Sequence, residues 1–274
     1  MRGLVGIARL PKGGFGNRLW AYLNLRSIAE ITESSYFSKN PVDVRRVRGI
    51  NRRPKLPLSA RRVAEIWPRH LEEGHLVSQI QDYLFEGRVV SLRGPMLGEV
   101  FAELAQSPNS IREDILTRRC DSALRASGGE RLGVLHLRGG DFADWDPTAI
   151  LSSDYYLQSV EIVLEHAGSM HFRICTDDPR HPALASVKQH LSSKGLLVAD
   201  HDCAQPLECD FSAMVESESL ISSPSTFSIL AGIIGTPFIT QSRSWAENRA
   251  EKGELFWQLA VSGKLIGYPV SALV

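Results

Sequence analysis

The fold is decided by residues 131–141, which read RLGVLHLRGGD. The first seven residues form a mostly apolar run typical of a buried strand, and polar residues and two glycines follow where the strand ends. From there to residue 240, apolar runs alternate with segments of helical periodicity. We expect strands at 131–137, 172–175, 196–199, 220–221 and 237–240, and helices at 154–167, 182–193, 210–217 and 226–234. This alternation predicts an α/β fold with a parallel sheet covered on both faces, which binds ligands at the carboxyl ends of its strands.

The amino-terminal part is less regular. Residues 4–8 are predicted to form a strand, and a glycine-rich loop at 12–17 leads into a helical pattern. Residues 39–69 are arginine-rich, and prolines within them break any helix. They are interpreted either as a solvated loop or as a lip that holds or steers an anionic ligand. Residues 95–125 have a helical pattern.

A polar break at residues 127–130, Ser-Gly-Gly-Glu, predicts a domain boundary. We therefore expect a first domain at residues 1–126 and a second at residues 127–250. The closing segment, residues 251–274, carries an amphipathic stretch that is expected to form a helix packing back on the first domain.

Composition excludes several classes of function. Lys+Arg and Asp+Glu number 31 each, so no global field favours nucleic acid or an anionic membrane. Apolar stretches fall short of the roughly 18 residues that a spanning helix needs, and the first ten residues lack a signal-peptide pattern. The four cysteines, at 120, 175, 203 and 209, lack paired spacing. We expect a cytoplasmic protein with no membrane span, no nucleic-acid partner and no disulfide scaffold.

Two motifs place anion-binding groups at strand ends. In GGFGN, residues 13–17, glycines permit close backbone approach, and N–H groups at a helix start attract phosphate; a tight turn is the alternative. His136 and Arg138 alternate along one strand, so their side chains share a face, and this basic pair suits a pyrophosphate. The alternative is an ion pair of Arg138 with Asp141 beside a merely packed His136.

Two further motifs carry polar side chains. TDDP at residues 176–179 follows an apolar strand, and its two carboxylates suit a metal, ribose hydroxyls or, favoured for the motif in isolation, a helix cap. Asp210 is expected to open a helix, ahead of SPSTFS at residues 223–228. Serine and threonine at a helix start supply hydroxyl and N–H donors to an anion, and Ser225 also suits an N-cap.

The order GGFGN, HLRGGD, TDDP, then an aspartate followed by STFS, resembles the GDP-fucose-dependent fucosyltransferases, a superfamily with α1,2-, α1,6- and protein O-fucosyltransferase branches. The resemblance implies a GT-B fold of two facing Rossmann-like domains, with residues 1–126 on the acceptor side and 127–250 binding the GDP-sugar. It implies inverting transfer of L-fucose from GDP-β-L-fucose to a glycan or protein hydroxyl. No metal or other cofactor is expected.

Roles follow by position from this resemblance. Arg138 would contact the β-phosphate and support the departure of GDP, while Asp141 is a candidate general base. Asn17 would reach the phosphates or fucose from the facing domain. The remaining donor-binding residues implied by the resemblance are Gly14, Phe15 and Gly16 in the first loop, His136 near guanine or ribose, Asp177 at the ribose or its loop, Asp210 on the guanine N1–H and amino group, and Ser225, Thr226 and Phe227 at the diphosphate.

One position departs from the family. Many relatives have two adjacent arginines where this chain has Arg138 followed by Gly139, so a second charge is missing. Three alternatives therefore stay open: transfer from another GDP-hexose, a nucleotide-sugar-binding protein without transfer, and phosphoryl transfer with Asp177 and Asp178 on magnesium. The last lacks the P-loop that usually accompanies it.

Overall fold

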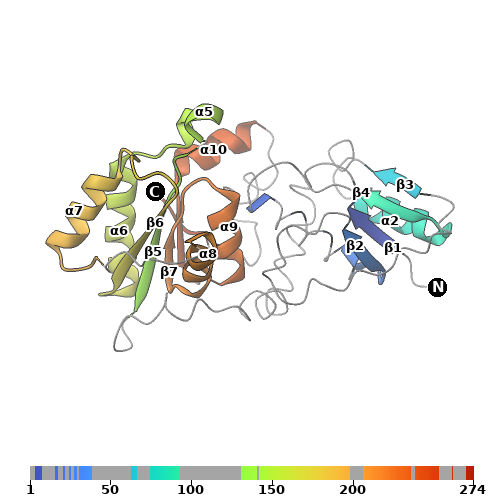
Figure 1. Cartoon of the computed structure of the whole chain (residues 1–274), viewed down its shortest axis with the longest axis horizontal. Helices are drawn as coiled ribbons and strands as arrows, with labels where there is room; N and C mark the ends of the chain where they lie inside the picture. Colours follow the sequence, from blue (N-terminus) through green and yellow to red (C-terminus); the bar gives the residue numbers. More distant parts are fainter. Residues whose placement is uncertain are drawn as a thin grey trace. The chain divides into compact units, whose positions relative to one another are not determined.

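The computed structural model describes residues 4–7, 16–17, 21, 25, 28–29, 31–38, 63–66, 75–92, 131–140, 142–197, 206–235, 238–252, 261 and 270–274. The chain divides into two compact units, Met1–Arg118 and Arg119–Val274, and each contains one parallel sheet (Figure 1). The boundary expected at residue 126 and the helical pattern at 95–125 lie outside the described residues.

The first unit has a four-stranded sheet in the order β2-β1-β4-β3. Its elements are β1 (Leu4–Ile7), β2 (Ser35–Ser38), β3 (Val63–Ile66), α2 (His75–Phe85) and β4 (Val89–Leu92). Val5 and Val90 pack with Leu25, Ile28 and Ile80 in a buried core. The strand predicted at 4–8 is confirmed. The prediction of irregular chain across 39–69 is wrong for β3, where a short apolar run among arginines pairs with β4.

The second unit has a five-stranded parallel sheet in the order β6-β5-β7-β8-β9. Its strands are β5 (Leu132–Leu137), β6 (His171–Thr176), β7 (Ser219–Ile221), β8 (Phe238–Gln241) and β9 (Val270–Leu273). Its helices are α5 (Phe142–Trp145), the 3-10 helix η3 (Pro147–Ala149), α6 (Ser153–Ala167), α7 (Leu184–Ser193), α8 (Pro206–Glu216), α9 (Thr226–Ile234) and α10 (Arg243–Glu251).

Most elements predicted between residues 131 and 240 are confirmed, with three corrections. Residues 270–273 are a strand beside β8 and not part of a helix, so the sheet contains a strand that the periodicity does not predict. The strand predicted at 196–199 is reduced, among the described residues, to a single bridge between Phe172 and Leu197. The helix expected to start at Asp210 begins one turn earlier, at Pro206.

The two faces of this sheet differ in chemistry. Leu135, Leu137, Phe172 and Ile174 point into an apolar cluster with residues of α6 and α7. Because side chains alternate along a strand, the intervening residues of β5 and β6 point to the other face, where α8 and α9 lie (Figure 1). On that face the register sets His136 of β5 beside Cys175 of β6. The buried polar side chains His136 and Arg173 therefore lie on the face of the sheet that α8 and α9 cover.

Two features bear on the expectations from composition. Within the part of the chain that the structure describes, no helix is both long and apolar enough to cross a membrane. Cys175 is a buried free thiol, whereas Cys209 on α8 is disulfide-bonded. The spacing of the cysteines did not predict this bond.

Candidate functional site

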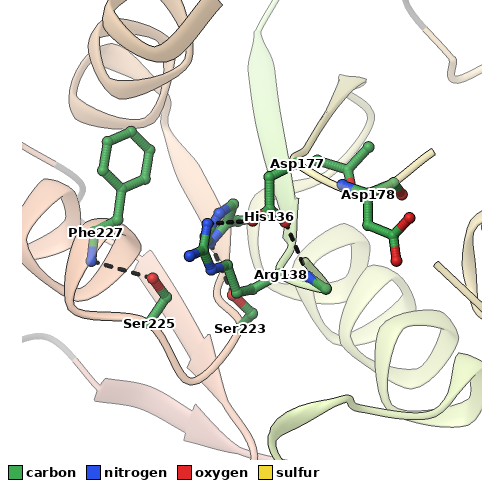
Figure 2. Close-up of polar contacts among 9 residues, drawn as sticks. His136, Arg138, Asp177, Asp178, Ser223, Ser225 and Phe227 are labelled. Carbon is green, nitrogen blue, oxygen red and sulfur yellow. Dashed lines mark hydrogen bonds and ion pairs between the residues drawn. The ribbon is translucent and has the colours of Figure 1, made fainter. Parts of the chain in front are cut away.

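Side chains from β5, β6 and the start of α9 converge at one edge of the second sheet (Figure 2). Since the strands are parallel, their carboxyl ends meet at this edge, the usual ligand site of an open α/β sheet. The residues that carry the HLRGGD, TDDP and STFS motifs are the ones found there. Three motifs that are far apart in sequence thus belong to one site.

Arg138 is held in place from two sides. Its guanidinium forms an ion pair with Asp177, and it lies over the ring of Phe142, 4.9 Å from the ring centroid. The other carboxylate oxygen of Asp177 accepts a 2.9 Å hydrogen bond from the backbone N–H of Gly139. The Arg138 side chain keeps 24% of its surface exposed, so the cation is both fixed and accessible to a ligand. Among the described residues its carboxylate partner is Asp177; Asp141 lies outside them.

The two glycines of the HLRGGD motif leave room for the carboxylates of the TDDP motif. A Cβ atom on Gly139 would lie 2.6 Å from Cβ of Asp178, and one on Gly140 would lie 2.7 Å from Asp177 Oδ2. Gly140 also has a φ of +41°, in the region that L side chains rarely adopt. A side chain at position 139 would therefore clash with Asp178.

Both carboxylates of the TDDP motif are engaged within the protein. Asp178 Oδ1 accepts a 2.8 Å hydrogen bond from the backbone N–H of Arg180, and Asp177 binds Arg138 and Gly139. The interpretation of this pair as a helix cap is therefore wrong: the Asp178 hydrogen bond closes a turn, and the next helix, α7, has Ala183 as its N-cap with no side-chain hydrogen bond. Among the described residues, no group of three or more His, Cys, Asp or Glu side chains is placed to hold a metal ion. Three of the four carboxylate oxygens of this pair therefore already take part in hydrogen bonds or an ion pair within the protein.

His136 is a buried, neutral imidazole. Its Nδ1 lies 2.8 Å from Ser223 Oγ, and its ring lies 5.7 Å from that of Phe227. Burial, reinforced by the neighbouring Arg138 and His181, lowers its pKa to about 3. The ring therefore adds no positive charge at neutral pH, and its role fits packing against a base or ribose better than neutralising phosphate.

His181 also belongs to the site, and the sequence reasoning missed it. Its Nδ1 accepts a hydrogen bond from the backbone N–H of Ala183, and its ring packs edge-on against Tyr156. Burial lowers its pKa, partly opposed by Asp178 and Asp177. The only available signal was its place two residues after the TDDP motif.

The start of α9 is a rigid, hydroxyl-rich turn. Ser225 Oγ accepts from the backbone N–H of Phe227 at 3.3 Å, so Ser225 is the N-cap. Ser228 Oγ donates to the carbonyl oxygens of Ser223 and Ser225. A hydroxyl that accepts a hydrogen bond retains a proton to donate, and helix N–H groups point outward at this end. Capping and anion binding are therefore compatible roles for Ser225.

Asp210 lies inside α8, paired with a residue that the sequence reasoning did not single out. Arg173 Nη2 donates a 2.7 Å hydrogen bond to Asp210 Oδ1. The Arg173 side chain is 7% exposed and that of Asp210 is 22% exposed. Burial raises the pKa of the Asp210 carboxyl, and the Arg173 cation opposes that shift. An arginine within the run HFRICT was the sequence signal for this pair.

The second unit thus brings together part of the predicted site. Figure 2 shows His136, Arg138, Asp177, Ser225 and Phe227 together. Asp210 contacts Cys175, which the register sets beside His136, and Thr226 is the first residue of α9. Gly14, Phe15 and Asp141 lie outside the described residues. Gly16, which is buried, and Asn17, which is exposed, lie in the first unit. Their contribution to the same site stays a prediction.

Comparisons with known proteins give a limited result. No family model matches the chain, and no curated protein proves similar to it. Similar solved structures include POFUT1 in complex with GDP, 13% identical with a TM-score of 0.47 over 84% of this chain and 94% of that chain. Another is NodZ alpha-1,6-fucosyltransferase soaked with GDP-fucose, 12% identical with a TM-score of 0.47 over 89% of this chain and 96% of that chain. Because the sequence identities and TM-scores are this low, the function has to be inferred from the chain's own residues.

Proposed function

We propose that the chain is an inverting glycosyltransferase that transfers L-fucose from GDP-β-L-fucose to a hydroxyl of a glycan or protein. The observation that carries this proposal is Arg138, fixed by Asp177 at the sheet edge where α9 begins. We assign GDP-fucose as the donor because the four sequence motifs occur in the same order as in the GDP-fucose-dependent fucosyltransferases. In this proposal the two units form a GT-B enzyme, the second binding the donor and the first facing the acceptor.

The charges of the site suit a diphosphate. An arginine binds phosphate oxygens through its planar fork, and the first turn of a helix adds backbone N–H donors and the positive end of its dipole. Arg138 and the Ser225–Phe227 turn supply these groups at one edge of the sheet. His136 is neutral and adds no further positive charge to the site. No metal is needed for this neutralisation.

The reaction follows from where charge develops. The acceptor hydroxyl attacks C1 of fucose as the bond from C1 to the β-phosphate oxygen breaks, and the bonding pair leaves with GDP. Negative charge grows on that oxygen, so a preorganised cation stabilises the transition state more than the ground state. Arg138 takes this role, and the acceptor proton passes to a base, for which Asp141 is the candidate.

Different residues recognise the guanine base and the diphosphate-fucose end of the donor. Asp210 accepts hydrogen bonds from the guanine N1–H and amino group, which adenine does not offer in that pattern. Thr226 and Phe227 bind the diphosphate alongside Ser225. Asn17 and the backbone of residues 14–16 approach the phosphates or fucose from the first unit.

Calorimetric titration with GDP-fucose, GDP-mannose and UDP-galactose tests the proposal, with and without EDTA, on the wild type and on Arg138→Ala. We expect metal-independent binding of GDP-fucose that is weakened in the variant. Tighter binding of GDP-mannose would replace fucose by another hexose. Binding of GDP-fucose with neither hydrolysis nor transfer across an acceptor screen would identify a binding protein, and no binding of GDP nucleotides would refute the assignment.

A further inference from the structure

Arg173 occupies a position that a strand interior normally gives to an apolar side chain. It lies in β6 between Phe172 and Ile174, both buried, and its own side chain is only 7% exposed. The register places it beside Val134 of β5, on the face where α8 and α9 lie. A buried guanidinium needs a specific partner to offset the loss of hydration.

Its partner is Asp210, and the pair is incompletely satisfied. Arg173 Nη2 bonds to Asp210 Oδ1, but Nη1 is buried without a hydrogen-bond partner among the described residues. Replacing such a buried ion pair by apolar side chains is often neutral or stabilising. Stability therefore does not account for an arginine at this position.

The charge of Asp210 depends on this arginine. Among the described groups, Cys175 from β6 also contacts the carboxyl, His136 on β5 is neutral, and α9 has no titratable side chain. Burial favours the protonated form of the carboxyl. Among the described residues, the Arg173 guanidinium is the positive charge that opposes this effect and favours the ionised carboxylate. One oxygen of Asp210 is used by Arg173, and the side chain is exposed enough for the other to meet a ligand.

We propose that Arg173 is a positioning residue for base recognition: it holds Asp210 as an ionised, oriented carboxylate whose second oxygen accepts from the Watson–Crick edge of guanine. The inference rests on the proposed function and deepens it, because it makes the choice of base depend on a residue inside the sheet. Without the arginine, Asp210 would be protonated at low pH and would accept poorly from the base.

The test compares GDP with inosine diphosphate, which has the same diphosphate and lacks the 2-amino group. Calorimetry from pH 5.5 to 8.5 on the wild type should show GDP bound about tenfold or more tightly at every pH, as expected for a hydrogen bond to a charged group. In Arg173→Met this preference should disappear at low pH and return as pH rises. Arg173→Lys, which retains the charge, should keep a preference independent of pH.

Two controls separate a positioning role from general damage. Arg131→Met removes an exposed arginine that pairs with Glu218 on the same sheet, and should leave the ratio of affinities unchanged. Arg173→Gln repeats the loss of charge with a polar side chain if the methionine variant does not fold. Weaker binding of both nucleotides by the same factor would be a structural effect, since the ratio would not move.

Four outcomes would overturn the inference. If Arg173→Met and Arg173→Gln prefer GDP over inosine diphosphate as strongly as the wild type at every pH, Arg173 does not determine this preference. A low ratio that does not recover at high pH would mean that Asp210 is displaced rather than neutralised. An unchanged ratio in Asp210→Asn would show that another group reads the base, leaving GDP-sugar transfer intact. A wild type that binds neither nucleotide would refute the proposed function as well.

Discussion

Gly139 lies directly against Asp178, so that a Cβ atom on the glycine would come within 2.6 Å of the aspartate Cβ. Gly139→Ala should therefore force the loops after β5 and β6 apart and lower the free energy of unfolding by about 1–3 kcal/mol. Because Gly139 also donates to Asp177, the partner of Arg138, GDP should bind more weakly. Urea denaturation and calorimetry with GDP measure the two effects.

The clash itself has a matched control. Asp178→Gly removes the opposing Cβ, so the double variant Gly139→Ala/Asp178→Gly should be more stable than the sum of the two single losses implies. If the two single losses in the free energy of unfolding simply add, the contact between residues 139 and 178 does not cause the instability of Gly139→Ala. Gly139→Arg, which adds a second positive charge beside Arg138, should bind GDP more weakly than the wild type because of the same clash.

Arg138 should matter more for turnover than for donor affinity. Arg138→Ala removes the cation that faces the leaving phosphate, and the rate at saturating donor should fall about 10²–10³-fold. Asp177→Asn keeps the cation but loosens its position, so the rate should fall by less. Steady-state kinetics with GDP-fucose checks both variants. Equal rates for Arg138→Ala and the wild type would rule out the mechanism, whereas equal losses in the two variants would mean that position matters as much as charge.

Acid should destabilise the second unit through His136. Its folded-state pKa of about 3 lies below the 6.5 of an unfolded chain, so the unfolded state binds a proton that the folded state does not. The contribution of His136 to the free energy of unfolding is fully present above about pH 6.5. It is lost as the pH falls toward 3, at up to about 1.4 kcal/mol per pH unit. When the free energy of unfolding is measured by urea denaturation between pH 7 and pH 4, it should fall less steeply with decreasing pH in His136→Gln than in the wild type. The variant should retain some slope, since the pKa of His181 is lowered as well. Parallel slopes in the wild type and the variant would refute this account.

Much of the second unit could be predicted from its sequence, because elements such as α6 and α9 show their burial in the spacing of apolar residues. The strand β9 could not, since it pairs with β8 across a long stretch of chain and is only four residues long. The same holds within the site. Periodicity sets which residues end a strand, but the register that brings Arg173 to Asp210 depends on how β6 and α8 pack. The contact of Asp178 with Gly139 likewise joins two loops that no local pattern connects.

Ser225 allows the cap of α9 to be separated from binding of the diphosphate. Its hydroxyl accepts from the Phe227 N–H, so Ser225→Ala should lower the free energy of unfolding by about 1 kcal/mol. Ser225→Asp keeps a good capping oxygen and should leave stability near that of the wild type. Its carboxylate, however, would lie where the diphosphate is proposed to bind and would repel it, so GDP affinity should fall at least about tenfold. Ser225→Asn, a neutral residue that caps equally well, is the matched control and should bind GDP more tightly than the aspartate variant. Equal GDP affinities for the aspartate and asparagine variants would place the diphosphate away from this helix, whatever their stabilities.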